Sequence, residues 1–186
     1  MTEPLPPHAL PISPAAASLL HKLSSHRVEF VLVGPLAAAV HGCRASGEEV
    51  AIVPARFSRN IDRLAKALRA VGAQWHESPD AATQPVDVTA ERLQTLGHWP
   101  LSTELGDLDV DFEPPATAGH LDLFEGARRF ALAPGLGVEV AAAADLLRIA
   151  ELRGSRADEA AAAALREILA ERADRVRMAA ADLAGG

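Results

Sequence analysis

The stretch VLVGPLAAAVHG at residues 31–42 and the stretch GEEVAIVP at residues 47–54 decide the fold of this chain. The first stretch opens with apolar, mainly β-branched residues typical of a buried strand, and Gly34 ends that strand. Pro35 suits the first turn of the alanine-rich helix that follows, because the N–H it lacks has no partner there. The second stretch predicts another buried strand at residues 50–53, with acidic residues at its entrance and Pro54 at its end.

The chain before this stretch predicts an arm, a helix and the start of the first strand. Residues 1–14 carry five prolines, which fix φ and remove backbone donors, so a flexible extended arm is expected there. Ser13 before Pro14 is a start signal for a helix over residues 15–25, since it combines a cap with proline at the first helical position. The first strand is expected over residues 28–33.

The chain after the second strand alternates helical and extended patterns. Apolar residues at spacings of three and four predict a long amphipathic helix that opens at Phe57-Ser58 and closes at Gly72. Three shorter elements are predicted next: a strand at residues 73–76, a loop at residues 77–88, and a helix capped by Thr89 that runs to Leu96 and ends at Gly97.

A hairpin carries the second group of acidic residues. Its predicted arms are residues 100–105 and 108–112, on either side of Gly106-Asp107. The second arm alternates apolar and acidic residues with period two. Asp109 and Asp111 are therefore expected on the same face of the strand.

The C-terminal part is expected to become purely helical. A short helix at residues 121–127 and a hairpin around Pro134-Gly135 precede a helix over residues 143–153, which ends at Gly154, and a last helix from Arg156. The fold class is therefore α+β, a small mixed sheet flanked by helices with a helical C-terminal region. The expected organisation is an arm at residues 1–14, an α/β core at residues 15–141 and a helical region at residues 142–186 packed on it.

Composition excludes several classes of protein. With 49% hydrophobic residues in 186, the chain should form a packed core, and its single cysteine, Cys43, excludes an internal disulfide framework. The net charge of −7 argues against nucleic acid as the main partner, because phosphate neutralisation supplies most of such affinity. No apolar run approaches the length of about 20 residues that spans a bilayer. The start of the chain has no basic signal region, so a cytoplasmic protein without a membrane partner is expected.

Residues 28–160 resemble the nucleotidyltransferase-fold (polymerase beta-like) superfamily, in the branch that includes abortive-infection and toxin–antitoxin members. The resemblance rests on the glycine turn at Gly34-Pro35, on His41-Gly42 at the end of the helix, and on the strand that ends in Ile52-Val53-Pro54. Aligned on that strand, the two aspartates of the family fall on Glu49 and Ala51. The neighbouring threonine and arginine of the family fall on Gly47 and Ala45, with Arg44 next to the latter. Gly106-Asp107-Leu108-Asp109-Val110 resembles the strand of the third carboxylate, and the lysine of the family falls on Ala150.

The resemblance implies which residues form the site, and it also implies that some groups needed for catalysis are missing. Glu49 and Asp109 are the catalytic candidates, and Glu49, Asp109 and Asp111 are the candidates for holding magnesium. Gly34, Pro35 and Arg44 are the candidates for contacting a nucleoside triphosphate. Three family features are missing, namely the donor N–H at Pro35, the carboxylate at Ala51 and the charge at Ala150. Because two-metal catalysis depends on such groups, no cofactor is expected unless the protein is active, in which case it is magnesium.

Plainer interpretations of these residues stay open. Glu48-Glu49 also fits a solvated strand entrance. Asp107, Asp109 and Asp111 also fit the wet face of a hairpin, or a displaced metal site together with Glu49. His41 fits a packing residue at a helix end better than a catalytic base. The histidines lack metal-ligand spacing, so zinc is not supported.

Three functions therefore follow from the sequence. The first is a catalytically degenerate nucleotidyltransferase-fold protein with a binding or regulatory role, related to toxin–antitoxin or defence systems. The second is an active magnesium-dependent nucleotidyltransferase that acts on RNA or protein. The third is a structural module that self-associates through the N-terminal arm or the long alanine-rich C-terminal helix, in which residues 160–169 allow close helix packing. The expected partners are a nucleoside triphosphate and a protein partner or a second copy of the chain.

Overall fold

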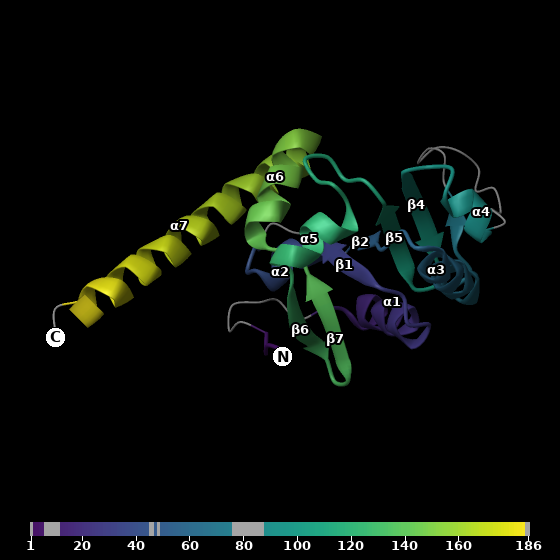
Figure 1. Ribbon diagram of the computed structural model, residues 1–186, viewed down its shortest axis with the longest axis horizontal. Helices are drawn as coiled ribbons and strands as arrows, with labels where there is room; N and C mark the ends of the chain where they lie inside the picture. Colours follow the sequence, from purple (N-terminus) through teal and green to yellow (C-terminus); the bar gives the residue numbers. More distant parts are fainter. Residues whose placement is uncertain (1, 6–11, 45–46, 48, 76–87, 185–186) are drawn as a thin grey trace.

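The computed structural model describes residues 2–5, 12–44, 47, 49–75 and 88–184. Within them the chain forms a mixed sheet flanked by helices, with a long helix at the C-terminus, so the α+β class is confirmed (Figure 1). The strands of the sheet lie in the order β3-β4-β5-β2-β1-β7-β6. Residues 77–87 of the predicted loop over residues 77–88, together with Ala45 and Glu48, lie outside the described residues.

The two strands at the centre of the sheet, β1 and β2, come from residues 30–54. β1 (Phe30–Val33) is buried along its whole length, and α2 (Gly34–Val40) begins directly at its end. β2 (Val50–Pro54) runs antiparallel to β1 and parallel to β5 (Gly106–Asp111). In this register Ala51 lies opposite Val33 on one side and Asp109 on the other. The strands read as apolar runs because both faces of the sheet are covered.

The remaining elements complete one sheet and its helical cover. The other strands are β3 (Gln74–Trp75), β4 (His98–Thr103), β6 (Arg128–Ala133) and β7 (Leu136–Val140). The other helices are α1 (Pro14–Ser25), α3 (Ser58–Ala70), α4 (Ala90–Leu93), α5 (His120–Gly126), α6 (Ala143–Arg153) and α7 (Arg156–Ala184).

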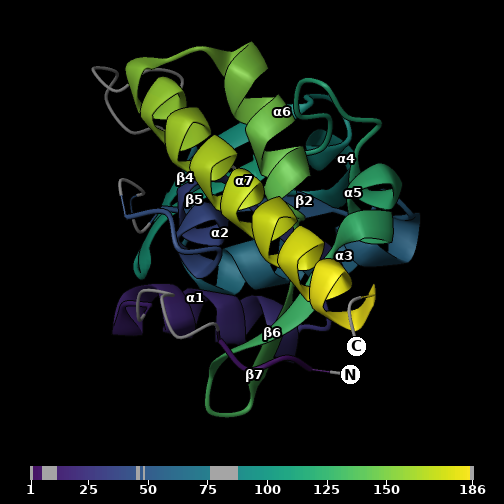
Figure 2. The same cartoon turned by 90° about the vertical axis from the view of Figure 1, so that its left-hand side faces the viewer.

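Two groups of helices cover the sheet. α1 and α3 pack against each other, and α1 also contacts β5 and β7. α2 packs against α6 and α7, and Figure 2 shows α7 crossing in front of α6 with the sheet behind them. Beyond residue 172, α7 leaves the body of the molecule: residues 173–182 are all exposed, and Figure 1 shows this end projecting away from the sheet. In the part of the chain that the structure describes, every helix is too short or too polar to cross a bilayer.

Most local predictions from the sequence are confirmed. The side chain of Ser13 accepts from the N–H of Ala16 at 3.2 Å at the start of α1, and Thr89 accepts from the N–H of Arg92 at 3.2 Å at the start of α4. Gly154, with φ of 65°, ends α6 in the left-handed conformation that favours glycine. The hairpin around Pro134-Gly135 is formed by β6 and β7.

Four predictions about these elements are wrong in detail. β1 begins at Phe30 rather than at residue 28, and α4 ends at Leu93 rather than at Leu96. The turn of the β4–β5 hairpin is Glu104-Leu105, not Gly106-Asp107. Asp109 and Asp111 do not form a wet face, because only 8% and 6% of these residues is exposed. The hairpin lies inside the sheet, beside β2, and the end of α6 covers this part of it.

His41 is a packing residue, as the sequence indicates. It lies at the end of α2 and is 4% exposed. Its Nε2–H donates to the carbonyl of Ala141 at 2.8 Å, and its Nδ1 accepts from Nη2 of Arg172 at 3.2 Å. Its ring also meets Phe130 edge to face. The histidine therefore ties α2 to the chain after β7 and to α7.

Candidate functional site

The turn at Gly34 brings β1 and α2 against β2. Gly34 has φ of 68°, and a Cβ built on it would lie 2.9 Å from the Cβ of Ala51. Real Cβ atoms do not approach this closely, so glycine at 34 is required by both the backbone conformation and the neighbour. The residue that occupies the second aspartate position of the resemblance is thus packed directly against the glycine turn.

A cavity of about 260 Å³ opens at this turn. Four of the residues that the sequence singles out line it together: Gly34, Pro35, Glu49 and Asp109. Ala51 and Ala150, which occupy the positions of an aspartate and a lysine in the motif resemblance, line it as well. The antiparallel β1–β2 pair and the parallel β2–β5 pair explain this grouping, because the end of β1 and the start of β2 then meet at one edge of the sheet.

Two of the predicted site residues lie elsewhere. Asp111 lines a neighbouring cavity that it shares with Asp109, His98 and Arg153. Arg44 is exposed and is not among the described residues that line the cavity at Gly34. Its predicted contact with a nucleotide stays a prediction.

Arg153 and His98 hold the carboxylates of β5. Nη2 of Arg153 donates to Oδ2 of Asp111 at 2.8 Å and lies 3.9 Å from Oδ2 of Asp109. Nε2 of His98 contacts Oδ1 of Asp109. The backbone N–H of Glu113 donates to Oδ1 of Asp111 at 3.0 Å. Each aspartate is therefore bound by groups of the chain itself.

The sequence did not point to Arg153 or to His98. Arg153 lies three residues after Ala150, so the spacing of neighbours on a helix face was a usable signal. His98 was missed because the turn of the β4–β5 hairpin was predicted at Gly106-Asp107, two residues too late in the chain. With the turn at Glu104-Leu105, His98 pairs with Asp111 across the hairpin, next to Asp109. A shift by an even number of residues keeps each side chain on its face but changes its cross-strand partner.

The pKa values of the two carboxyl groups that line the cavity, Glu49 and Asp109, are both raised. Desolvation raises the pKa of Asp109, against the attraction of His98 and Arg153. Desolvation also raises the pKa of Glu49, and the charges of Asp109 and Asp107 raise it further. Glu49 and Asp109 therefore lie close enough to repel each other, as two ligands of one ion would.

The N-terminus of α7 also faces the cavity and also has a partner from the chain. Ser155 and Asp158 line the cavity, and Oδ2 of Asp158 accepts from the N–H of Ser155 at 3.2 Å and from its hydroxyl at 2.6 Å. The N–H of Asp158 donates back to Oγ of Ser155 at 3.2 Å. This reciprocal cap places a carboxylate at the end of the helix where an anion would be most favoured.

The donor set, as arranged, does not fit a magnesium clamp. Arg153 occupies the space between Asp109 and Asp111, on the side of the carboxylates where a cation would bind. Among the described residues, no group of three His, Cys, Asp or Glu side chains is placed to hold a metal ion. A metal bound by Glu49, Asp109 and Asp111 stays a prediction that requires Arg153 to move.

A scan against protein-family models and a search of curated proteins found no match to this chain. The role of the site is therefore argued from its geometry and from the motif resemblance in the sequence.

Proposed function

We propose that the chain is a nucleotidyltransferase-fold protein whose nucleotide site has lost its catalytic machinery and serves a binding or regulatory role. The grouping of the motif residues supports the fold, since Gly34, Glu49 and Asp109 line one cavity at the edge of the sheet. A role within a toxin–antitoxin or defence pair rests on the motif resemblance alone.

The observation that carries the loss of catalysis is that two of the three candidate metal ligands, Asp109 and Asp111, are already bound by groups of the chain itself. Arg153 binds Asp111 and approaches Asp109, and His98 contacts Asp109. Nucleotidyl transfer requires carboxylates that are free to hold divalent ions and donors that are free to hold phosphates. Ala51 lies in register beside Asp109 and supplies no ligand where a second carboxylate would complete the clamp.

The experiment measures turnover and binding together. The protein is incubated with each nucleoside triphosphate, magnesium or manganese, and RNA or protein acceptors, and pyrophosphate release is followed. The expected release equals that of the double variant Glu49→Gln/Asp109→Asn. Calorimetry with the same nucleotides should show an affinity that is equal in magnesium and in chelator, because no clamp senses the ion.

The alternative function is an active magnesium-dependent nucleotidyltransferase that acts on RNA or protein. The shared cavity of Glu49 and Asp109 favours it, together with the raised pKa of Glu49, which desolvation and then the repulsion from Asp109 produce. Pyrophosphate release that is lost in Glu49→Gln/Asp109→Asn but retained in Asp107→Asn would establish this alternative. Asp107 is a matched control because it is exposed on the same strand and is not among the described residues that line the cavity.

A further inference from the structure

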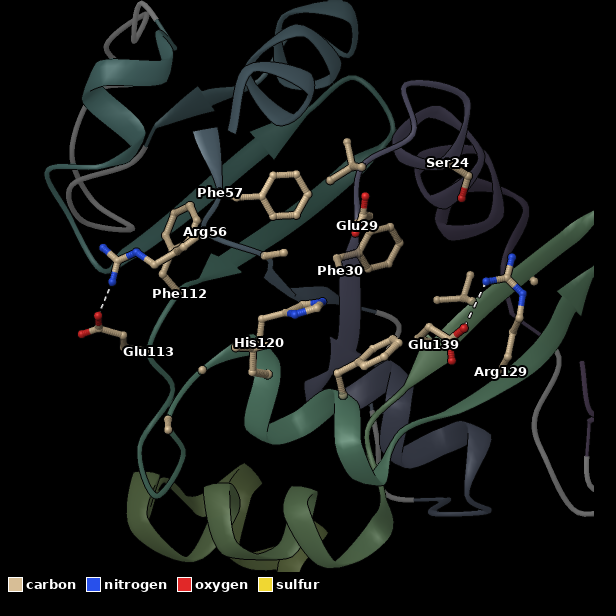
Figure 3. Close-up of a pocket in the computed structure, with 18 residues that line it drawn as sticks. Ser24, Glu29, Phe30, Arg56, Phe57, Phe112, Glu113, His120, Arg129 and Glu139 are labelled. Carbon is tan, nitrogen blue, oxygen red and sulfur yellow. Dashed lines mark hydrogen bonds and ion pairs between the residues drawn. The ribbon is translucent and has the colours of Figure 1, made fainter. Parts of the chain in front are cut away.

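A second cavity, of about 860 Å³, lies at the opposite edge of the sheet (Figure 3). It is bounded by the residues that enter β1, by those that follow β2 and β5, by the start of β7 and by α5. The cavity at Gly34 lies instead at the end of β1. The two sites are thus separated by the length of the central strands.

The walls of this cavity concentrate the aromatic side chains of the chain. Aromatic residues make up only 4% of the sequence, with five phenylalanines and no tyrosine. Four of these five phenylalanines, all within the described residues, line the cavity: Phe30, Phe57, Phe112 and Phe124. Phe57 and Phe124 remain 46% and 49% exposed, so both rings are accessible to a molecule in the cavity. Pockets for small molecules are typically apolar and aromatic, with volumes of roughly 300–1,000 Å³.

The charged side chains at the rim are already paired. Arg56 pairs with Glu113 and lies over the ring of Phe112, 5.2 Å from its centre. Arg129 pairs with Glu139 at 3.1 Å. Glu29 accepts from Arg63 at 3.3 Å. Because each rim charge has its partner, the cavity selects for a molecule without net charge.

One polar atom of the wall has no partner. Nδ1 of His120 is buried and has no hydrogen-bond partner among the described residues. Figure 3 shows the imidazole pointing from the start of α5 into the cavity, and the ring stacks on Phe124 with centres 5.5 Å apart. Burial lowers the pKa of His120, against the opposing charge of Glu29, and so favours the neutral ring. No hydrogen bond is formed by either ring nitrogen of His120 within the described residues, so the ring keeps its capacity to form one hydrogen bond with a molecule bound in the cavity.

The frame around the cavity is firmly held. Asn60 is fully buried, and its Oδ1 accepts from the N–H of Glu29 at 2.7 Å. Its Nδ2 donates to the carbonyls of Glu29 at 2.8 Å and Ala55 at 2.9 Å. This amide ties the entrance of β1 to the exit of β2, so the cavity is part of the fold rather than a gap between loose segments.

We propose that this cavity binds a small, uncharged, planar aromatic molecule that carries one hydroxyl or N–H group directed at His120. The site is independent of the nucleotide-site proposal, since the two share no described lining residue. 2-Naphthol has the required chemistry and serves as the probe.

The five phenylalanines allow a direct test. All are replaced by 4-fluorophenylalanine, and the ¹⁹F spectrum of the full chain is followed while 2-naphthol is added. The four cavity signals should move along one saturable curve with a Kd of about 0.1–1 mM, as expected for a molecule of this size. Phe130 packs against His41 and is not among the described residues that line the cavity, so its signal should stay in place as the internal control. Absence of saturation, or movement of Phe130 alone, would overturn the proposal.

Two sets of variants locate the binding energy. His120→Phe should weaken binding about five- to tenfold, the usual effect of one hydrogen bond, while His21→Phe on the exposed side of α1 should not. If circular dichroism shows that His120→Phe is unfolded, Phe57→Ala with Phe124→Ala carries the test, because both side chains are half exposed. That pair should weaken binding more than tenfold, and Leu152→Ala, 65% exposed on α6, should leave it unchanged. Equal affinity in the cavity and control variants would refute the site.

Discussion

Nη2 of Arg153 lies 2.8 Å from Oδ2 of Asp111, and this contact joins the end of α6 to β5, the strand that carries two of the three predicted metal ligands. The side chain of Arg153 is 28% exposed and that of Asp111 is 9% exposed, so the pair is largely shielded from water. A guanidinium thus takes the place that a divalent cation would have next to Asp109 and Asp111. This contact connects the stability of the fold with the proposed loss of catalysis.

Arg153→Ala should destabilise the protein. Removing Arg153 leaves the buried Asp109 with only His98 and Asp111 with only the N–H of Glu113, at a cost of about 2–4 kcal/mol, which lowers Tm by roughly 5–15 °C for a chain of this size. Thermal unfolding at pH 7 measures the effect. Arg166→Ala is the matched control, because its pair with Glu151 is 56% and 44% exposed and should contribute less than about 1 kcal/mol. Equal effects of the two variants would show that the Arg153 pair is only a surface contact.

Restoring a carboxylate at position 51 should create a metal site if Arg153 is removed. Ala51 lies in register beside Asp109, so Ala51→Asp with Arg153→Ala would place a second carboxylate next to it and free both for a cation. Manganese binding, followed by electron paramagnetic resonance, should appear in this double variant. Ala51→Asn with Arg153→Ala keeps the shape without the charge and should not bind. Equal manganese binding by the unaltered protein would contradict the proposed role of Arg153.

Gly34→Ala should be more destabilising than Gly135→Ala. Both glycines have positive φ, 68° and 72°, so each substitution carries a backbone cost of about 1–2 kcal/mol. A Cβ at Gly135 meets nothing within 4 Å, whereas at Gly34 it overlaps Ala51. The overlap should add about 1–3 kcal/mol, measured as the difference between the two variants in urea unfolding. Indistinguishable midpoints would mean that the turn relaxes easily.

Glu49→Gln should stabilise the protein at pH 7 but not at pH 4. The pKa of Glu49 is raised in the folded state, so the folded protein holds this proton more tightly than the unfolded chain. Its favourable contribution is therefore complete below the ordinary pKa of glutamate and is lost as pH rises through the raised folded pKa. Glutamine removes the repulsion with Asp109 and Asp107. Because Glu49 is exposed, the gain should be at most about 1 kcal/mol.

Glu91→Gln is the control for this pH effect, because the pKa of Glu91 is shifted in the opposite direction to that of Glu49. Its pKa is lowered, mainly by its own backbone N–H and then by Thr89, so its contribution is present above the ordinary pKa and is lost as pH falls. Thermal unfolding at the two pH values should show Glu91→Gln less stable than the unaltered protein at pH 7. A gain at pH 7 in both variants would point to a general effect of reducing negative charge.

Deleting residues 174–186 should leave the core folded. Residues 173–182 are exposed, and Val176 and Met178 are each 69% exposed, so their loss removes little buried surface. Tm should change by less than about 2 °C. Light scattering on the same variant tests the predicted self-association. A change from an oligomer to a monomer would assign the association to this end of α7. A large fall in Tm for a monomeric protein would instead show that the core depends on this segment.

The motif residues of the candidate site could be predicted because local patterns determine them. The apolar runs, Gly34, Pro35 and Pro54 specify where β1 ends and where β2 lies. Period two in β5 places Asp109 and Asp111 on one face. Each of these signals depends on residues close together in the sequence. The positions that they singled out, Gly34, Glu49, Ala51, Asp109 and Ala150, do line one cavity in the structure.

The partners of those residues required the tertiary structure. His98 reaches Asp109 only through the exact turn of a hairpin, and a two-residue error in that turn changes every cross-strand neighbour. Arg153 reaches Asp111 from 42 residues away because α6 packs over this part of the sheet. Likewise, the phenylalanines of the second cavity come from separate parts of the chain: Phe30 from β1, Phe57 from the residue before α3, Phe112 from the residue after β5 and Phe124 from α5.

The sequence by itself thus determined the α+β class and the strand–glycine–helix–strand centre, since these depend on local propensity and alternation. Only the tertiary structure decided that the remaining carboxylates are bound by Arg153 and His98, and that a separate aromatic cavity exists. Ion pairs and cavities depend on side chains that meet across long stretches of chain, and such distances are set by packing rather than by neighbours in the sequence.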